Sequence, residues 1–151
     1  TELAAEDRCH LNGIAVAGGK VQFVSALGRT NEARGWRENK ANGGVLIHYE
    51  SGEVFAAELS MPHSPRIYGG RAWVLESGVG ELQLLDPASA VRQTVCRLPG
   101  YPRGLAFYGQ YAFVGLSKIR EKNMFGGLKI ETLFPELQCG VMVVDLQRGA
   151  V

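Results

Sequence analysis

The chain has 151 residues, enough for one ordinary domain with a substantial core. Its 16 basic and 15 acidic side chains nearly cancel, so no net field attracts nucleic acid or an anionic membrane surface. No apolar run reaches the roughly 20 residues that a membrane-spanning helix needs.

The cysteines and the first residue bear on location and processing. Cys9, Cys96 and Cys139 are an odd number, far apart, and without a CxxC or Cys/His cluster. This pattern disfavours a disulfide framework or a structural zinc site and predicts reduced thiols in a cytoplasmic protein. Because the chain opens with Thr1 rather than Met, we expect either a removed leader or a piece of a longer protein.

The first predicted unit covers about residues 9–59. Residues 11–26, LNGIAVAGGKVQFVSA, read as a strand, a glycine hairpin and a second strand. A polar connection over residues 27–42 leads to two more apolar runs, 44–49 and 53–59, which a Glu-Ser-Gly turn separates. The pattern therefore predicts four consecutive strands.

Two further units repeat this order, over about residues 63–98 and 101–151, and the last is truncated in its fourth strand. The second has a hairpin at Gly69-Gly70, then apolar runs over 80–86 and 90–98 around a turn at 87–89. In the third, residues 102–117 align without a gap on 11–26 at an offset of 91, and 140–145 is a further strand. The best helical candidate, 128–137, is short and interrupted by Pro135.

Four-stranded antiparallel units that repeat every 40 to 50 residues or so are typical of a β-propeller. We therefore predict an all-β, β-propeller-like domain over residues 1–151 with about three four-stranded antiparallel blades. A β-sandwich or an irregular barrel also has many short strands, but neither needs the repeated four-strand order.

Three blades would leave an apolar sheet face open at each end of the row. Known propellers close with about four to eight blades, since each blade buries its faces against two neighbours. We expect either a homodimer that completes a six-bladed ring, or remaining blades in a longer chain. Both alternatives stay open at this point.

Strand order also predicts where the loops lie. In a four-stranded meander, the start of the first strand and the connection from the second to the third strand share one end. That end collects residues 9–12, 62–66 and 101–103 and the long connections 27–42 and 118–138. The opposite end has only tight turns, so we expect binding at the loop-rich end.

The candidate ligand-binding residues are the polar and aromatic side chains of this loop-rich end: Asn12, Trp36, Arg37, Glu38, His63, Arg66 and Arg103. Two arginines at one pocket would suit a carboxylate or phosphate, and Trp36 could add a stacking face. The structural alternative is that these groups satisfy loop backbones, or that Arg66 or Arg103 pairs with Glu38 or Glu121.

Other chemistry has weaker support. Ser64 and His63 are adjacent on an extended chain and point opposite ways, so they are not a catalytic dyad. Asn12 with Glu38 or Glu76 offers too few oxygens for Ca²⁺. The paired glycines lack the context of a phosphate-binding turn, and no histidine has a companion at metal-site spacing. The sequence therefore predicts no cofactor.

Long stretches of the chain resemble a conserved, mainly bacterial family known only as a domain of unknown function. They are CHLNGIA (9–15), GWRENKANGGVL (35–46), LSMPHSPR (59–66), WVLESGVGEL (73–82), LPGYPRGLAF (98–107), YAFVGLSKIRE (111–121) and FGGL (125–128). The resemblance implies no reaction, but its members look longer than this chain. It thus implies that these residues are a subset of the blades.

A looser similarity is to the six-bladed gluconolactonase and strictosidine-synthase-like propellers, through Asn12-Gly13. Those proteins hold a central metal with Asn and acidic residues, whereas Arg and His stand in the corresponding places of the other two units here. Our leading hypothesis is a protein that binds a small anionic ligand or a peptide. The rivals are a metal-dependent hydrolase or lyase using Asn12 and Glu38, and a purely structural module.

Overall fold

Glycine turns and alternating apolar residues fold the chain into three antiparallel sheets. The structure is a computed structural model that describes residues 3–86, 88–89 and 91–151. Pro87 of the expected turn and Ala90 of the expected strand lie outside the described residues.

Sheet 1 consists of β1 (Leu11–Ala17), β2 (Lys20–Ala26), β3 (Gly44–His48) and β4 (Val54–Leu59), in that order. Sheet 2 consists of β5 (Pro62–Tyr68), β6 (Arg71–Glu76), β7 (Glu81–Leu85) and β8 (Arg92–Arg97), again in sequence order. Sheet 3 consists of β9 (Tyr101–Tyr108), β10 (Tyr111–Ser117) and β11 (Gly140–Asp145).

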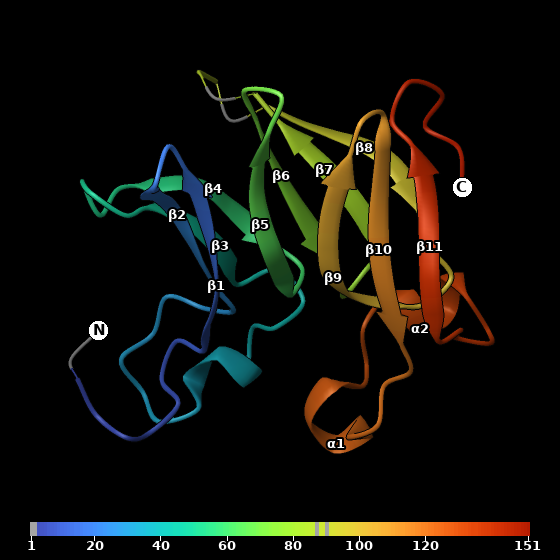
Figure 1. The fold of residues 1–151 in the computed structure, drawn as a ribbon. Helices are drawn as coiled ribbons and strands as arrows, with labels where there is room; N and C mark the ends of the chain where they lie inside the picture. Colours follow the sequence, from blue (N-terminus) through green and yellow to red (C-terminus); the bar gives the residue numbers. More distant parts are fainter. Residues whose placement is uncertain (1–2, 87, 90) are drawn as a thin grey trace.

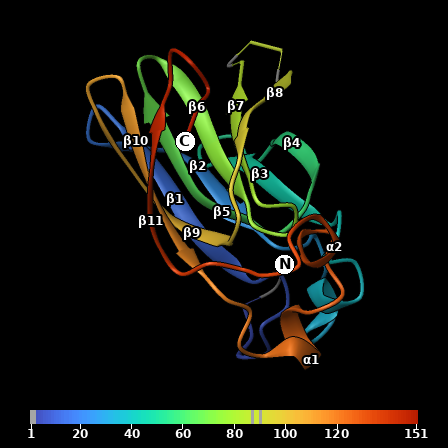
Figure 2. The ribbon, with the colours of Figure 1, turned by 90° about the vertical axis from the view of Figure 1, so that its right-hand side faces the viewer.

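The sheets stand side by side in chain order, with their first strands β1, β5 and β9 next to one another (Figure 1). Tight hairpins lie at one end; at the first two, Gly18-Gly19 and Gly69-Gly70 have positive φ, which glycine adopts without strain. The long connections lie at the opposite end with α1 (Lys122–Phe125) and α2 (Ile130–Leu133) (Figures 1 and 2).

Two apolar cores fill the spaces between the sheets. Between sheets 1 and 2, Phe23 and Leu46 pack against Val74. Between sheets 2 and 3, Trp73 and Val114 belong to a larger cluster. Sheets 1 and 3 therefore each bury one face against sheet 2, and sheet 2 buries both of its faces.

A third core closes the loop-rich end. Leu27, Trp36, Met61, Tyr101, Leu128 and Ile130 form it. The two long connections also touch directly, because Lys40 Nζ donates to the Met124 carbonyl at 2.9 Å. This end is a packed layer of loops with the 3-10 turn η1 (Gly35–Arg37), rather than a set of separate loops.

The expected all-β class and three antiparallel sheets are confirmed. The third sheet has three strands among the described residues, with one further bridge between Asp145 and Ala150, and the sheets do not close into a barrel. The helical candidate over 128–137 contains only the single turn α2. No helix in the described part of the chain is long and apolar enough to cross a membrane.

The gapless repeat is wrong in its second half. In sheet 1, Ala15 pairs with Phe23 but Val16 pairs with Val21, so β2 carries an extra residue there. Sheet 3 has no such shift, and Ala106 pairs with Phe113. Phe23 therefore corresponds to Phe113 at an offset of 90, whereas the first strands keep the offset of 91.

Candidate functional site

Each first strand carries one extra residue near its start, at the loop-rich end. The pairing skips Asn12 in β1, one of the two residues Ser64 and Pro65 in β5, and Arg103 in β9. Such bulges re-aim a side chain away from the regular alternation of a strand. At these three equivalent positions, the direction of the side chain therefore differs from the alternation that the sequence pattern predicts.

In sheets 1 and 2 a side chain at the bulge donates a hydrogen bond to the next sheet. Asn12 Nδ2 donates to the Pro62 carbonyl at 2.9 Å, while its Oδ1 accepts from Ser25 Oγ at 2.6 Å. Ser64 Oγ donates to the Arg103 carbonyl at 2.8 Å. The Asn12 amide is therefore engaged on both sides, in the structural role that was the alternative to ligand contact.

Arg66 has a similar structural role. Its Nε donates to the Leu105 carbonyl at 3.0 Å, and its Nη1 lies 2.9 Å from the Pro65 carbonyl and 3.4 Å from that of Ile14. The guanidinium thus joins the first strands of all three sheets. Its partners are backbone carbonyls, as in the structural alternative to ligand contact, and not Glu38 or Glu121.

His63 is buried and neutral. Its Nδ1 lies 2.9 Å from the Met61 carbonyl and 3.0 Å from Ser77 Oγ, so the Nδ1–H donates to the carbonyl. Burial lowers the pKa of the imidazole to about 4, and the positive charge of Arg103 acts in the same direction. Because the imidazole is neutral at physiological pH, His63 offers no positive charge to an anionic ligand.

The Trp36 prediction was wrong in one respect. The indole is only 1% exposed, so it offers no stacking face at the surface, and its Nε1 donates to Asp7 Oδ2 at 2.9 Å. The Arg37 guanidinium lies over the same ring, with its carbon 5.5 Å from the centroid. Arg37 Nε is buried without a hydrogen-bond partner among the described residues, and Glu38 is exposed.

Arg103 differs from the other bulge residues because its side chain holds no neighbouring sheet. Its guanidinium carbon lies 5.0 Å from the Tyr101 ring centroid and 5.2 Å from that of Phe125. Within the described part of the chain, it forms no ion pair with Glu38 or Glu121. Two aromatic faces thus hold a cation whose N–H groups lack an acidic partner.

Tyr101 forms the floor beside this cation. The residue is 2% exposed, and no described atom forms a hydrogen bond of good geometry with its Oη. Burial raises the pKa of the phenol, while the nearby Arg103 guanidinium lowers it. The His63 ring lies 6.1 Å away, edge to face, so two predicted site residues, His63 and Arg103, meet through Tyr101.

A pocket of about 210 Å³ opens next to Arg103. Its lining residues are Tyr101, Arg103, Ser117, Lys118, Ile119, Arg120, Glu121 and Phe125. Three of these side chains are cationic and one is anionic, so the pocket favours an anion. Its aromatic and aliphatic lining would lower the local polarity and strengthen such contacts.

The chain segment around Arg120 and Glu121 also borders a second, wider hollow of about 510 Å³. Arg37 and Lys122 line it together with Arg120 and Glu121, which both hollows share. Arg37 therefore lies near the Arg103 pocket through a common wall, although it is far away in the sequence.

Sequence reasoning missed Tyr101, Lys118 and Arg120 as individual site residues. A signal for two of them was present, because the run KIREK over residues 118–122 has four positions of basic or acidic type, with only one acid among them. Tyr101 gave no signal, since an aromatic residue at a strand start reads as core.

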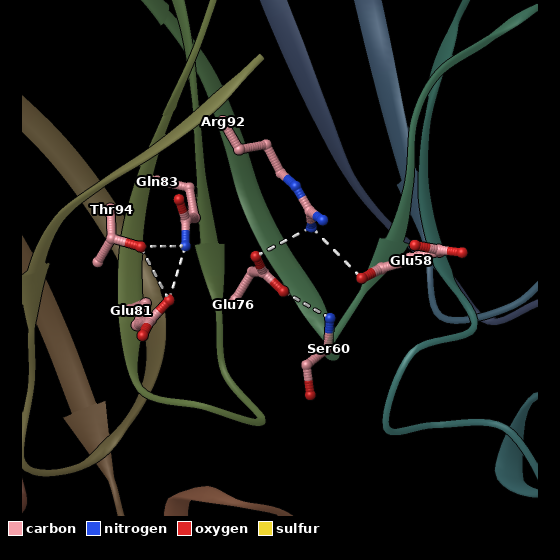
Figure 3. Close-up of polar contacts among 7 residues, drawn as sticks. All are labelled: Glu58, Ser60, Glu76, Glu81, Gln83, Arg92 and Thr94. Carbon is pink, nitrogen blue, oxygen red and sulfur yellow. Dashed lines mark hydrogen bonds and ion pairs between the residues drawn. The ribbon is translucent and has the colours of Figure 1, made fainter. Parts of the chain in front are cut away.

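A buried polar network lies elsewhere, between sheets 1 and 2 (Figure 3). Glu76 accepts from the Ser60 backbone N–H at 2.7 Å and from Arg92 Nη1 at 3.3 Å. Arg92 Nη1 also reaches the Glu58 carbonyl at 3.3 Å. Burial raises the pKa of Glu76, and the charge of Glu81 on the facing strand adds to this.

The second carboxylate of the network, Glu81, has its own donors. Its Oε2 accepts from Gln83 Nε2 at 2.7 Å and from Thr94 Oγ1 at 3.1 Å (Figure 3). Its Oε1 accepts from Arg97 Nε at 2.8 Å. Glu76 and Arg92 therefore connect the end of β4 to sheet 2, whereas the contacts of Glu81 lie within sheet 2.

The metal hypothesis gains no support from these contacts. The Asn12 amide is engaged by protein groups, and Glu38 lies exposed in the connection between β2 and β3. Across residues 3–86, 88–89 and 91–151, no group of three or more His, Cys, Asp or Glu residues is placed to hold a metal ion.

The structure is that of an all-β protein with a hollow at its loop-rich end that three basic side chains line. The chain belongs to the family described as "Domain of unknown function (DUF4915)", whose model matches residues 1–151. This confirms the family resemblance. No curated protein matches the chain significantly.

Two solved structures of designed proteins are similar to the chain. The computationally designed Ika4 protein has a TM-score of 0.51 at 11% identity, over 93% of this chain and 69% of that chain. The designed Ika8 protein has a TM-score of 0.42 at 12% identity, over 70% of this chain and 30% of that chain. At such identities only the Ika4 match bears on the fold, and neither bears on function.

Proposed function

We propose that the chain is a β-propeller-type binding module that holds a small anionic ligand in the pocket between Arg103, Lys118 and Arg120. Each sheet would be one blade, over about residues 9–59, 63–98 and 101–151. The meander order of the strands and the side-by-side first strands support this arrangement.

The observation that carries the proposal is the position of the Arg103 guanidinium. Its contacts with Tyr101 and Phe125 restrict the side chain, so little rotamer entropy is lost when a ligand binds. Its planar donors suit a carboxylate or a phosphate, which arginine can hold with two parallel hydrogen bonds.

The rest of the pocket fits the same ligand class. Lys118 and Arg120 are exposed and, among the described residues, form no ion pair, so both charges remain available. A volume of about 210 Å³ suits a small carboxylate, a phosphate or one acidic side chain of a peptide. The ligand would not contact the other predicted residues of this end, which do not line the pocket and would stabilise the surrounding structure instead: Asn12, Trp36, His63 and Arg66.

Cytoplasmic location is part of the proposal. Cys96 is buried, and burial raises the pKa of its thiol to about 11, so it stays an unreactive core group. Cys139 is exposed and forms no disulfide. Reduced thiols of this kind suit a reducing compartment.

Calorimetric titration with inorganic phosphate and with succinate, at constant ionic strength set by chloride, tests the binding site. We expect saturable binding by the natural chain and at least about a tenfold weaker affinity after Arg103→Gln, since a charged hydrogen bond contributes about 1.5–3 kcal/mol. Lys20→Gln, at the hairpin end, is the matched control and should bind normally. Equal binding by both variants would contradict the proposal.

A further inference from the structure

The two long connections of the loop-rich end meet through aromatic rings. Trp36 lies in the turn η1, between β2 and β3, and stacks on Phe125 of α1 with the ring centroids 6.0 Å apart. The hydrogen bond from Lys40 to the Met124 carbonyl joins the same two connections. Segments that belong to sheets 1 and 3 therefore hold each other in place at this end (Figure 1).

Each of the two stacked rings has an arginine on it. The Arg37 guanidinium carbon lies 5.5 Å from the Trp36 ring centroid, and that of Arg103 lies 5.2 Å from the Phe125 centroid. Contacts between a cation and a ring face restrict a side chain. The stacked rings therefore hold two arginines, which are far apart in the sequence, at a spacing that is set before any ligand binds.

The wider hollow beside the Arg103 pocket has a basic lining of its own. Arg37 of the first connection and Arg120 and Lys122 of the second line it, and Glu121 is the acid among its lining residues. Both walls are described parts of this chain, because they come from the connections β2–β3 and β10–β11. The hollow therefore favours an anion, as the Arg103 pocket does.

Arg37 has a donor that the described residues leave without a partner. Its Nε is buried and forms no hydrogen bond with them. Asp7 interacts electrostatically with Arg37, but its carboxylate accepts from Trp36 and lies against His10. A buried donor without an acceptor costs free energy, so an anion that accepts from Arg37 would recover this cost.

We infer that the ligand of the Arg103 pocket carries two phosphate groups, and that the second group lies in the hollow beside Arg37. The inference rests on the proposed function and specifies its ligand. Arg120 and Glu121 line both hollows, so one small molecule can extend from the first hollow into the second. The restrained spacing of Arg37 and Arg103 favours two groups on one molecule over two separate anions.

The charge around the two hollows favours phosphates over carboxylates. One acidic side chain, Glu121, lies among five cationic ones, which leaves an excess of four positive charges. Two phosphate monoesters carry about three to four negative charges at neutral pH, whereas two carboxylates carry about two. The cationic side chains are Arg37, Arg103, Lys118, Arg120 and Lys122.

Calorimetric titration with alkane bisphosphonates, from ethane to octane, tests the inference against methylphosphonate at the same ionic strength. A linker that matches the two hollows should bind at least about tenfold more tightly than methylphosphonate, since the second group then binds at a high effective concentration. Shorter and longer linkers should lose this gain. Simple attraction between opposite charges would instead give nearly equal affinities along the series.

Substitutions in the second hollow locate the gain. Arg37→Gln should lower the ratio of the best bisphosphonate affinity to the methylphosphonate affinity by about tenfold, and Lys122→Gln by about threefold, because a buried charged donor contributes more than an exposed one. Arg29→Gln, exposed in the same connection as Arg37 and lining neither hollow, is the matched control and should keep the ratio. Circular dichroism checks that each variant is folded, and Lys122 is exposed, so its substitution should leave the fold intact.

The outcomes separate this inference from the function on which it rests. If methylphosphonate binds but no bisphosphonate binds more tightly, the second phosphate site is wrong and the anion pocket stands. A gain that is equal for all linkers, or that survives both Arg37→Gln and Lys122→Gln, would also overturn the inference. If neither probe binds the natural chain, the proposed function is wrong and the inference falls with it.

Discussion

The buried His63 should make the stability of the protein fall in mildly acidic solution. Burial lowers the pKa of the folded imidazole to about 4, against 6.5 as the ordinary value. The folded state therefore binds fewer protons than the unfolded state between these values, so the contribution is complete above pH 6.5 and is lost as the pH falls toward 4. The total loss is about 3 kcal/mol, of which about 2 kcal/mol is lost by pH 5.

Urea unfolding at pH 7.5 and pH 5.0 measures this loss. In His63→Asn, an amide N–H can still donate toward the Met61 carbonyl, but nothing titrates at this position, so the stability difference between the two pH values should shrink by about 2 kcal/mol. Glu76 acts in the opposite direction in both proteins and cancels in the comparison. Gln22→Asn, at a position without a titratable group, is the matched control and should keep the natural pH dependence. An unchanged difference in His63→Asn would refute a buried neutral imidazole.

Three more predictions concern stability. In Gly13→Ala the new Cβ would lie 2.6 Å from the Pro65 ring, so we expect a loss of roughly 1–3 kcal/mol, whereas Gly104→Ala, with its nearest atoms at 3.8 Å, should cost less; chemical denaturation compares them. Trp36→Ala should cost roughly 3–5 kcal/mol by the same measurement, because it empties the core of the loop-rich end. Because the pKa of Glu76 is raised in the folded state, this group adds stability as the pH falls through that pKa toward 4.5; Glu76→Gln should remove this gain in a pH series of thermal melts, and a series identical to that of the natural chain would contradict it.

The sequence predicts the strands and their turns well, because local signals determine them. Two glycine pairs, at 18–19 and 69–70, predict the hairpin turns. The apolar runs on either side of each pair predict the strands that the turn joins. The same logic predicted which end of the molecule carries the long connections. Even so, the one-residue bulge in β2 moved Phe23 relative to the gapless repeat, since a bulge leaves no clear mark in the residue types.

Site residues were harder to predict because their partners are backbone atoms. Arg66 was expected at a ligand because of its charge, yet it bonds to carbonyls of neighbouring strands, which no sequence pattern shows. Trp36 stands in a polar connection but is buried, because the two long connections pack together and enclose it. Arg103 instead lies against the Tyr101 and Phe125 rings and forms no ion pair among the described residues, so its role as a ligand contact stays a prediction.

Chemical-shift mapping of backbone amides during titration with inorganic phosphate tests anion binding at the loop-rich end most directly. The account predicts saturable shifts at Tyr101, Arg103 and residues 117–121, which line the Arg103 pocket, and little change at the hairpins 18–19, 69–70 and 109–110. Absence of saturable shifts, or shifts centred on the hairpin end, would contradict it.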